Sequence, residues 1–198
     1  MIVHDVVQGT PAWDLLRLGL PSASQFEKVY TSTGKIPKAF EEYVLELAAE
    51  RITKQKTQVF TNEWMQRGKD LEPVAVSAYE LITDTESQVI GFVTNDDRTV
   101  GCSPDRWQLE VKCPAAKNHL KYLSGGKCPA KYYPQVQGCI YLCETDRWDF
   151  MSYHPGMKPL ITTVYRDEIY IKGLEGALAL LLERVSETEQ ANRGENNV

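Results

Sequence analysis

The segment LEVKCP places the strongest constraint on how this chain folds. Leu109 and Val111 are apolar, whereas Glu110 and Lys112 are charged. Successive side chains of a strand point to opposite faces, so the alternation predicts a strand with one face in a core. Glu110 and Lys112 would then share the other face, about 7 Å apart along the backbone. A strand of this kind needs a covering layer of helices on its apolar side.

The remaining chain predicts helices and strands in an order typical of an α/β domain. A first helix ends at Pro21, and further helices are expected over residues 37–54, 61–81 (with Thr61 as cap), 115–124, 130–143 and from the cap at Asp167 onward. Strands are expected at QVIGFVT, TVGCSPD, LEVKCP, RWDFMSYH and LITTVYR. We therefore expect one domain over residues 1–198, with a central mixed β-sheet flanked by helices and a frayed tail from about residue 190.

Charge and hydropathy limit the partners of the chain. The net charge of −5 argues mildly against nucleic acid, unless the basic side chains gather on one surface. No apolar run approaches the ~20 residues that span a bilayer. The N-terminus lacks a basic region followed by an apolar stretch. We therefore expect a cytoplasmic protein with no membrane partner.

The cysteines do not predict a disulfide framework. Their number is odd, no CxxC pair occurs, and reduced core thiols are the favoured interpretation for Cys102, Cys113, Cys128, Cys139 and Cys143. A zinc or iron–sulfur site could use four of them, but their spacing fits no standard pattern.

Acidic residues near the alternating strand suggest a metal site. Asp105 follows Pro104 at the end of one predicted strand, and Glu110 lies in the next. Two such carboxylates can share one or two divalent ions such as Mg²⁺, and the Val111 backbone carbonyl is a further candidate ligand. A bound metal polarises a phosphodiester, and Lys112 could orient or deprotonate the attacking water. Alone, the pattern is more often an ordinary Glu–Lys pair on a solvated strand.

Five sequence blocks in order give the chain a family resemblance. These are QGTPAWDLLRLGLPSAS, RGKDLE, GCSPD, LEVKCP and YYPQVQ, between about residues 8 and 155. They resemble the lambda exonuclease family, also called the YqaJ-like viral recombinase family, within the PD-(D/E)xK nuclease superfamily. The resemblance implies a restriction-endonuclease-like core. It also implies a Mg²⁺-dependent 5′→3′ exonuclease, with Mn²⁺ as a substitute, that resects linear duplex DNA to 3′ single-stranded overhangs for annealing-type recombination.

The resemblance also assigns roles to the catalytic residues of this chain. Asp105 and Glu110 resemble the metal ligands, and Lys112 resembles the catalytic lysine. Glu72 resembles a helix-borne active-site acid, and Gln135 resembles an active-site glutamine. The alternatives without a function are a solvated helix residue for Glu72 and a helix residue with no special role for Gln135.

A second group of residues resembles the pocket for a 5′-terminal phosphate. Arg17 resembles the arginine that grips this phosphate, and Ser24 and Ser103 resemble hydroxyls that line its pocket. The resemblance also implies that Tyr132 borders the same cleft. A fork of guanidinium donors with hydroxyls suits a terminal phosphate, which carries more charge than an internal one. Arg17 as a surface charge and Ser24 as a helix cap remain the alternatives.

The resemblance alone implies the biological setting. The family assembles as a ring-shaped homotrimer that threads DNA, acts on duplex ends with a 5′-phosphate and works beside a single-strand annealing protein. Such proteins are encoded by phages or prophages and act in the cytoplasm of the bacterial host.

One departure from the family pattern lies beside the metal site. Only RWQL separates Asp105 from Glu110, and Arg106 stands where the family has a glycine. RWQL lacks Gly, Asn, Asp and Pro, so it is a poor turn. We therefore favour a mobile loop missing from the sequence over an unusually tight hairpin.

Two other functions compete with this assignment. One is a different PD-(D/E)xK nuclease, either an endonuclease or a Cas4-like exonuclease, which would need a four-cysteine iron–sulfur cluster. The other is a catalytically inactive module that binds DNA ends. A Ser/His/Asp hydrolase has no support, because His4, His119 and His154 lack any motif context.

Overall fold

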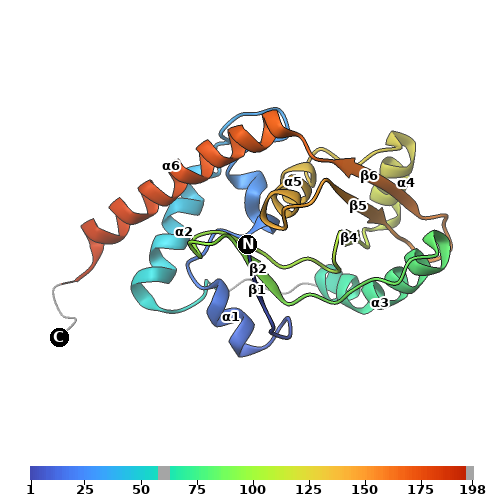
Figure 1. Ribbon diagram of the computed structural model, residues 1–198, viewed down its shortest axis with the longest axis horizontal. Coiled ribbons are helices and arrows are strands. Elements are labelled where there is room, and N and C mark those ends of the chain that lie inside the picture. The colour runs from blue at the N-terminus through green and yellow to red at the C-terminus, as the bar shows by residue number, and fades with distance from the viewer. Residues whose placement is uncertain (58–62, 195–198) are drawn as a thin grey trace.

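The computed structural model describes residues 1–57 and 63–194, as two small sheets enclosed by helices (Figure 1). The helices are α1 (Pro11–Arg17), the 3-10 helix η1 (Ala23–Lys28), α2 (Phe40–Thr53), α3 (Glu63–Thr83), α4 (Ala116–Gly125), α5 (Tyr133–Leu142) and α6 (Glu168–Asn192). The strands are β1 (Ile2–His4), β2 (Phe92–Thr94), β3 (Gly101–Cys102), β4 (Leu109–Lys112), β5 (Arg147–Ser152) and β6 (Leu160–Tyr165).

The predicted mixed α/β architecture is confirmed, with its strands divided between two sheets. The first sheet has the antiparallel order β1-β2-β3. The second has the order β4-β5-β6, in which β4 and β5 are parallel and β5 and β6 antiparallel. Pro104, which has no N–H to donate, follows β3 closely. The Asp105 side chain then takes the Val111 N–H at the free edge of β4, and both features keep β3 from extending the second sheet.

Several elements differ from those that the sequence predicts. Strand β1 was not expected, since IVH is too short to show alternation. The first helix ends at Arg17, before Pro21, because Gly19, with φ of 65°, turns the chain. The 3-10 helix η1 begins after Pro21, at Ala23. Helix α6 continues to Asn192. The predicted cap at Thr61 lies outside the described residues.

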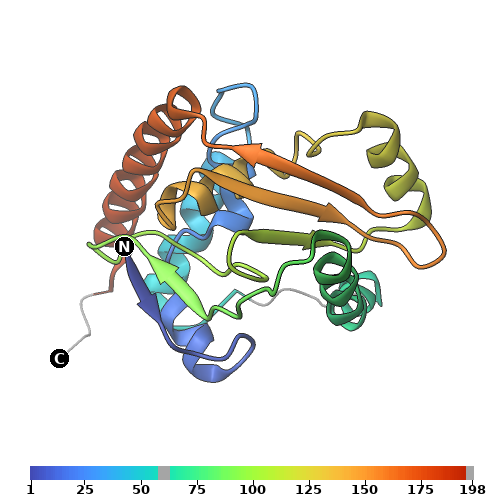
Figure 2. The same ribbon diagram turned by 45° about the vertical axis from the view of Figure 1, so that its right-hand side comes forward.

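The alternation in LEVK is confirmed by the packing of the second sheet. Leu109 and Val111 belong to a small hydrophobic cluster between α3 and the strands, together with Ala75, Val76, Tyr79 and Met151. Phe150, the register partner of Glu110, belongs instead to the large core that includes α2, α5 and α6. The sheet therefore lies between α3 and α5 (Figure 2). Each fully buried apolar side chain contributes roughly 1.5–3 kcal/mol.

Helix α5 is held very close to η1. A Cβ added to Gly138 would lie 2.4 Å from Cδ2 of Phe26, so only glycine allows this approach. The contact fixes the start of α5, where Gln135 lies one helical turn before Gly138.

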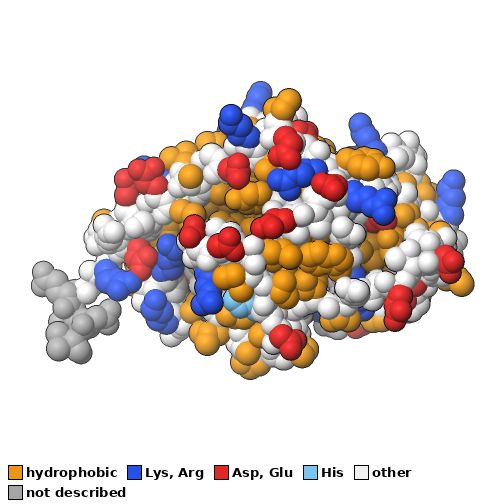
Figure 3. All heavy atoms as spheres, in the orientation of Figure 1, with side chains coloured by type: hydrophobic (Ala, Val, Ile, Leu, Met, Phe, Trp, Pro, Cys, Tyr) orange, Lys and Arg blue, Asp and Glu red, His pale blue; other side chains and the backbone are white. Residues whose placement is uncertain are grey.

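The surface in Figure 3 mixes acidic and basic side chains on the face shown. It is therefore not the segregated basic surface that DNA binding would require. Within the described ranges, no helix combines the length and the apolar character needed to cross a membrane.

Candidate active site

The link between Asp105 and Glu110 is a tight turn, so the expected missing loop is not required. Arg106 and Leu109 exchange backbone hydrogen bonds of 3.3 and 3.1 Å across Trp107 and Gln108. Gln108 takes the left-handed conformation, with φ of 60°, that turn-forming residues such as Gly adopt more readily. Tertiary contacts compensate for this: the Trp107 N–H donates to the Gln88 carbonyl at 2.8 Å, and its ring packs 6.3 Å from that of Trp148.

This turn brings Asp105 to the free edge of β4. Its Oδ2 accepts a hydrogen bond of 2.7 Å from the Val111 N–H. On the other edge, the carbonyls of Gln108 and Lys112 accept from the N–H groups of Asp149, in β5, and of Tyr153, directly after it. Because successive backbone groups of a strand alternate in direction, the Val111 carbonyl points to the same edge as Asp105. Asp105, Glu110 and this carbonyl, the predicted ligand set, thus lie together.

Glu110 is a buried carboxylate with little compensation. Only 1% of it is exposed, and Lys112 Nζ forms an ion pair with its Oε1. Within the described residues, neither oxygen has a hydrogen-bond partner of good geometry. Burial, helped by the charge of Asp105, raises the pKa of Glu110 to about 7, although Lys112 and the nearby Gln135 amide oppose the rise. Burial likewise raises the pKa of Asp105.

Lys112 keeps its charge in this environment. Burial lowers its pKa, but the carboxylates of Glu110 and Asp105 act more strongly in the opposite direction, so the net effect is a raised pKa. Its Nζ also lies 5.3 Å from the centre of the Tyr132 ring. Tyr132 stacks on Phe150 with ring centres 5.4 Å apart, and Lys131 lies 4.4 Å from the same ring. Tyr132 is therefore beside the predicted catalytic lysine.

Glu72 reaches the site from α3. Burial and the charge of Asp105 raise its pKa, whereas Arg106 and Lys112 lower it. Arg106 Nη1 lies 3.9 Å from Glu72 Oε1 and donates to the Asp105 carbonyl at 2.6 Å. In the sequence, Arg106 stands out only as a departure from the family pattern. The structure shows that it joins α3 to the turn.

The residues predicted for a terminal phosphate are brought together only in part. The Arg17 guanidinium lies 4.0 Å above the centre of the Trp13 ring, and Trp13 Nε1 donates to Ser103 Oγ at 2.9 Å. Arg17 Nη2 donates to Ser22 Oγ at 3.4 Å. Ser24, two residues after Ser22, is exposed. Trp13 and Ser22 were missed, although both lie in the sequence block that identified Arg17.

The cysteines and His119 lie in or against the hydrophobic interior, where they have structural contacts. Cys102, Cys139 and Cys143 are free thiols buried in the large core. Cys128 is half-buried against the same core, and Cys113 is half-buried against the small cluster. Among the described residues, no group of three or more His, Cys, Asp or Glu side chains has the arrangement of a metal site. His119 is fully buried and hydrogen-bonds to Ser152 Oγ at 2.8 Å.

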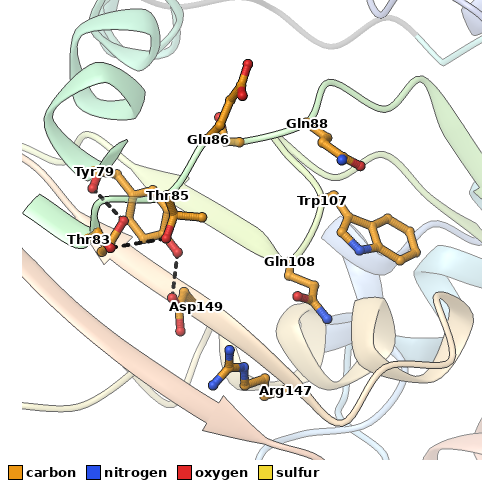
Figure 4. Close-up of a pocket in the computed structure, with 10 residues that line it drawn as sticks. Tyr79, Thr83, Thr85, Glu86, Gln88, Trp107, Gln108, Arg147 and Asp149 are labelled. Atoms are coloured by element: carbon orange, nitrogen blue, oxygen red, sulfur yellow. Dashed lines mark hydrogen bonds between the residues drawn. The ribbon is translucent and has the colours of Figure 1, made fainter. Parts of the chain in front are cut away.

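A polar cavity of about 340 Å³ lies behind the turn (Figure 4). Trp107 and Gln108 form one wall, and Tyr79, on α3, faces Asp149 of β5 across another. Tyr79 Oη donates to Asp149 Oδ2 at 2.6 Å, and Thr163 Oγ1 donates to Oδ1 at 2.7 Å. These bonds fix α3 and β5 around the turn.

Comparison with known proteins matches this chain to one family model and to several solved structures. The family model described as the YqaJ-like viral recombinase domain matches residues 12–146. An alkaline exonuclease from Laribacter hongkongensis, LHK-Exo, superposes with a TM-score of 0.84 and 27% identity, over 93% of this chain and 97% of that one. Its complex with dAMP gives the same TM-score, 0.84, over the same shares at 28% identity.

A more distant structure shares the fold. The phage-related exonuclease from Haemophilus somnus 129PT has a TM-score of 0.68 and 15% identity, over 87% of this chain and 96% of that one. The search of curated proteins gave no match.

Proposed function

The chain belongs to the YqaJ-like viral recombinase family, and on this premise we propose that it is a Mg²⁺-dependent 5′→3′ exonuclease that resects linear duplex DNA. The observation that carries the proposal is the Glu110 carboxylate, which is 1% exposed, paired with Lys112 and placed beside the second carboxylate of Asp105. Buried acids with a raised pKa beside a specific charge partner are typical of functional sites. The relative LHK-Exo is an alkaline exonuclease, which supports the same class of activity.

The residues present fit a hard divalent cation. Asp105 and Glu110 would hold Mg²⁺ with the Val111 carbonyl, since carboxylate and carbonyl oxygens are its preferred protein ligands. Burial and the charge of Asp105 raise the pKa of Glu110, and a bound cation would offset both effects. When bound, the ion would polarise the scissile phosphate and acidify a water; Mn²⁺ could replace it.

The side chains around these ligands have separable tasks. Lys112, kept protonated by Glu110 and Asp105, would orient the attacking water and offset charge on the reacting phosphate. Tyr132 restricts where the Lys112 ammonium can lie. Gln135 would orient Glu110 from the start of α5, and Glu72 would bind a water or a second ligand position from α3.

Arg17 would bind the DNA end from which digestion starts. We propose that Arg17 and Ser103 bind a 5′-terminal phosphate, joined by Trp13, with Ser24 contributing from η1 once DNA is present. Ser103 is two residues before Asp105, so an anchored end would present a nearby phosphodiester to the metal site. The complex of LHK-Exo with dAMP shows that this relative binds a nucleoside monophosphate.

Digestion of a linear duplex tests the proposal. Substrates carry a 5′-phosphate or a 5′-hydroxyl, with Mg²⁺ or EDTA, and wild type is compared with Lys112→Ala. We expect Mg²⁺-dependent loss of one strand from its 5′ end, faster with the phosphate and abolished in the variant. Cleavage of closed circular DNA would contradict an exonuclease.

Assembly and partners are part of the same proposal. We expect a homotrimer in the host cytoplasm, acting with a single-strand annealing protein. Sedimentation should then give about three times the chain mass of 22.4 kDa, and a monomer would contradict the ring.

A further inference from the structure

A second cation lies beside the Arg17 guanidinium. The described residues around Arg17 line a cavity of about 260 Å³, with Ser22, Tyr43, Glu50, Lys56 and Thr57 among its walls. Lys56 is in the segment that follows α2 and belongs to none of the sequence blocks that identified the site. Its position shows what a bound anion would meet besides Arg17.

The acids of this cavity are already neutralised or satisfied. Glu50 accepts from the N–H groups of Gly19 and Thr57, both at 2.9 Å. Glu46 pairs with Lys28 at 3.0 Å. Arg17, in contrast, has a buried Nε without an acceptor among the described residues. The unmet demand in the cavity is therefore for hydrogen-bond acceptors with negative charge.

Lys56 is held at this cavity by a partner that it can leave. Its Nζ pairs with Asp14 and lies 5.1 Å from the centre of the Trp13 ring. The side chains of Lys56 and Asp14 are 42% and 45% exposed. Ion pairs this exposed contribute about 0–1 kcal/mol, so exchange of partner costs little.

We propose that Lys56 is the second cation of the terminal-phosphate site and that it leaves Asp14 when a phosphate monoester binds beside Arg17. The inference rests on the proposed function. A terminal phosphate carries about −1.5 to −2 charges at pH 7, whereas an internal phosphodiester carries one. Two cations match the first better than the second. Trp13 contacts both of them, and through Ser103 it also contacts the strand end that leads to Asp105.

The test measures binding in EDTA, so that it does not depend on catalysis. Fluorescence anisotropy compares duplexes that differ only in a 5′-phosphate or a 5′-hydroxyl. We expect Lys56→Gln to lower the preference for phosphate about tenfold, the loss of one charge-assisted hydrogen bond. Lys56→Arg should keep most of the preference. Asp14→Asn should raise affinity for the phosphorylated end, because it removes both the competing partner and a repulsive charge.

Lys54→Gln is the matched control, because Lys54 is exposed, two residues away, and should leave the preference unchanged. An unchanged preference in Lys56→Gln overturns the inference. Equal weakening of both duplexes also overturns it, because Lys56 would then be a general DNA contact. Free nucleoside monophosphate is then added as a competitor. If the site binds DNA ends, its saturation should remove the preference for the phosphorylated duplex. A preference that survives saturation would indicate a separate site for free product and would overturn the inference. Failure of the wild type to digest DNA with Mg²⁺ would refute the proposed function instead, and the binding ratios would still decide the role of Lys56.

Discussion

Asp105 Oδ2 accepts a 2.7 Å hydrogen bond from the Val111 N–H, across the tight turn that separates the two residues. One carboxylate therefore serves two purposes. It satisfies the free edge of β4, where an unpaired N–H would otherwise remain. It is also placed beside Glu110: burial raises the pKa of both acids, and the charge of Asp105 raises the pKa of Glu110 further.

The two purposes of Asp105 can be separated by substitution. Asp105→Asn keeps an oxygen that can accept from Val111 but loses the charge, so we expect near-native stability. Asp105→Ala loses both and should lower the free energy of unfolding by about 1–3 kcal/mol. Both should lower nuclease activity at least about a hundredfold, because a metal ligand is lost. Urea unfolding in EDTA and digestion of 5′-phosphorylated duplex measure the two effects. Equal instability of both variants would show that the charge, rather than the hydrogen bond, holds the edge.

Mg²⁺ should stabilise the folded protein through Glu110. A ligand that binds only the folded state adds about 2.7 kcal/mol at a hundred times its Kd, which corresponds to roughly 5–10 °C in Tm for a chain of this size. Calorimetric scans with Mg²⁺ and with EDTA measure the difference. Glu110→Gln, similar in shape but uncharged, should abolish most of the gain. An equal gain in wild type and variant would place the metal elsewhere.

Sequence alone predicts the part of the site that obeys strand periodicity. The alternation in LEVK places Leu109 and Val111 against α3 and leaves Glu110 on the opposite face, as observed. Period-two patterning is local, so four residues suffice to predict it. The mixed α/β fold follows from the order of helices and strands, which is also predicted from local patterns.

Sequence does not predict features that depend on distant contacts. RWQL has no turn-forming residue, yet Trp107 closes the turn by contacts with Gln88 and Trp148, far away in the sequence. Similarly, Ser22 bonds to Arg17, whereas Ser24, which was expected to line the phosphate pocket, is exposed in η1. Side-chain direction in a short 3-10 helix follows from packing, which no pattern in the sequence displays.

The stability of the tight turn should depend on Trp107 more than on Gln108, the turn residue in the left-handed conformation. Trp107→Ala removes a large, partly buried ring and should destabilise the protein by about 3 kcal/mol, with loss of activity because Asp105 and Glu110 are no longer held together. Gln108→Gly relieves a positive φ of 60° and should be neutral or stabilising by up to about 1 kcal/mol. Thermal unfolding and nuclease rates of the two variants test this. A Gln108→Gly variant that loses activity while Trp107→Ala keeps it would contradict the account.

The Tyr79–Asp149 hydrogen bond should support the site without taking part in the reaction. Tyr79→Phe keeps the ring but removes the 2.6 Å bond to a carboxylate, which should lower the free energy of unfolding by about 1.5–3 kcal/mol. Burial and Asp149 raise the Tyr79 pKa, so this contribution is complete below about pH 10 and decreases as the pH rises further. Tyr165→Phe, at a side chain that is 69% exposed, is the control and should change little. Urea midpoints measure stability. Equal stability of both variants would show that the bond does not support the fold. A loss of kcat in folded Tyr79→Phe would show that it takes part in the reaction.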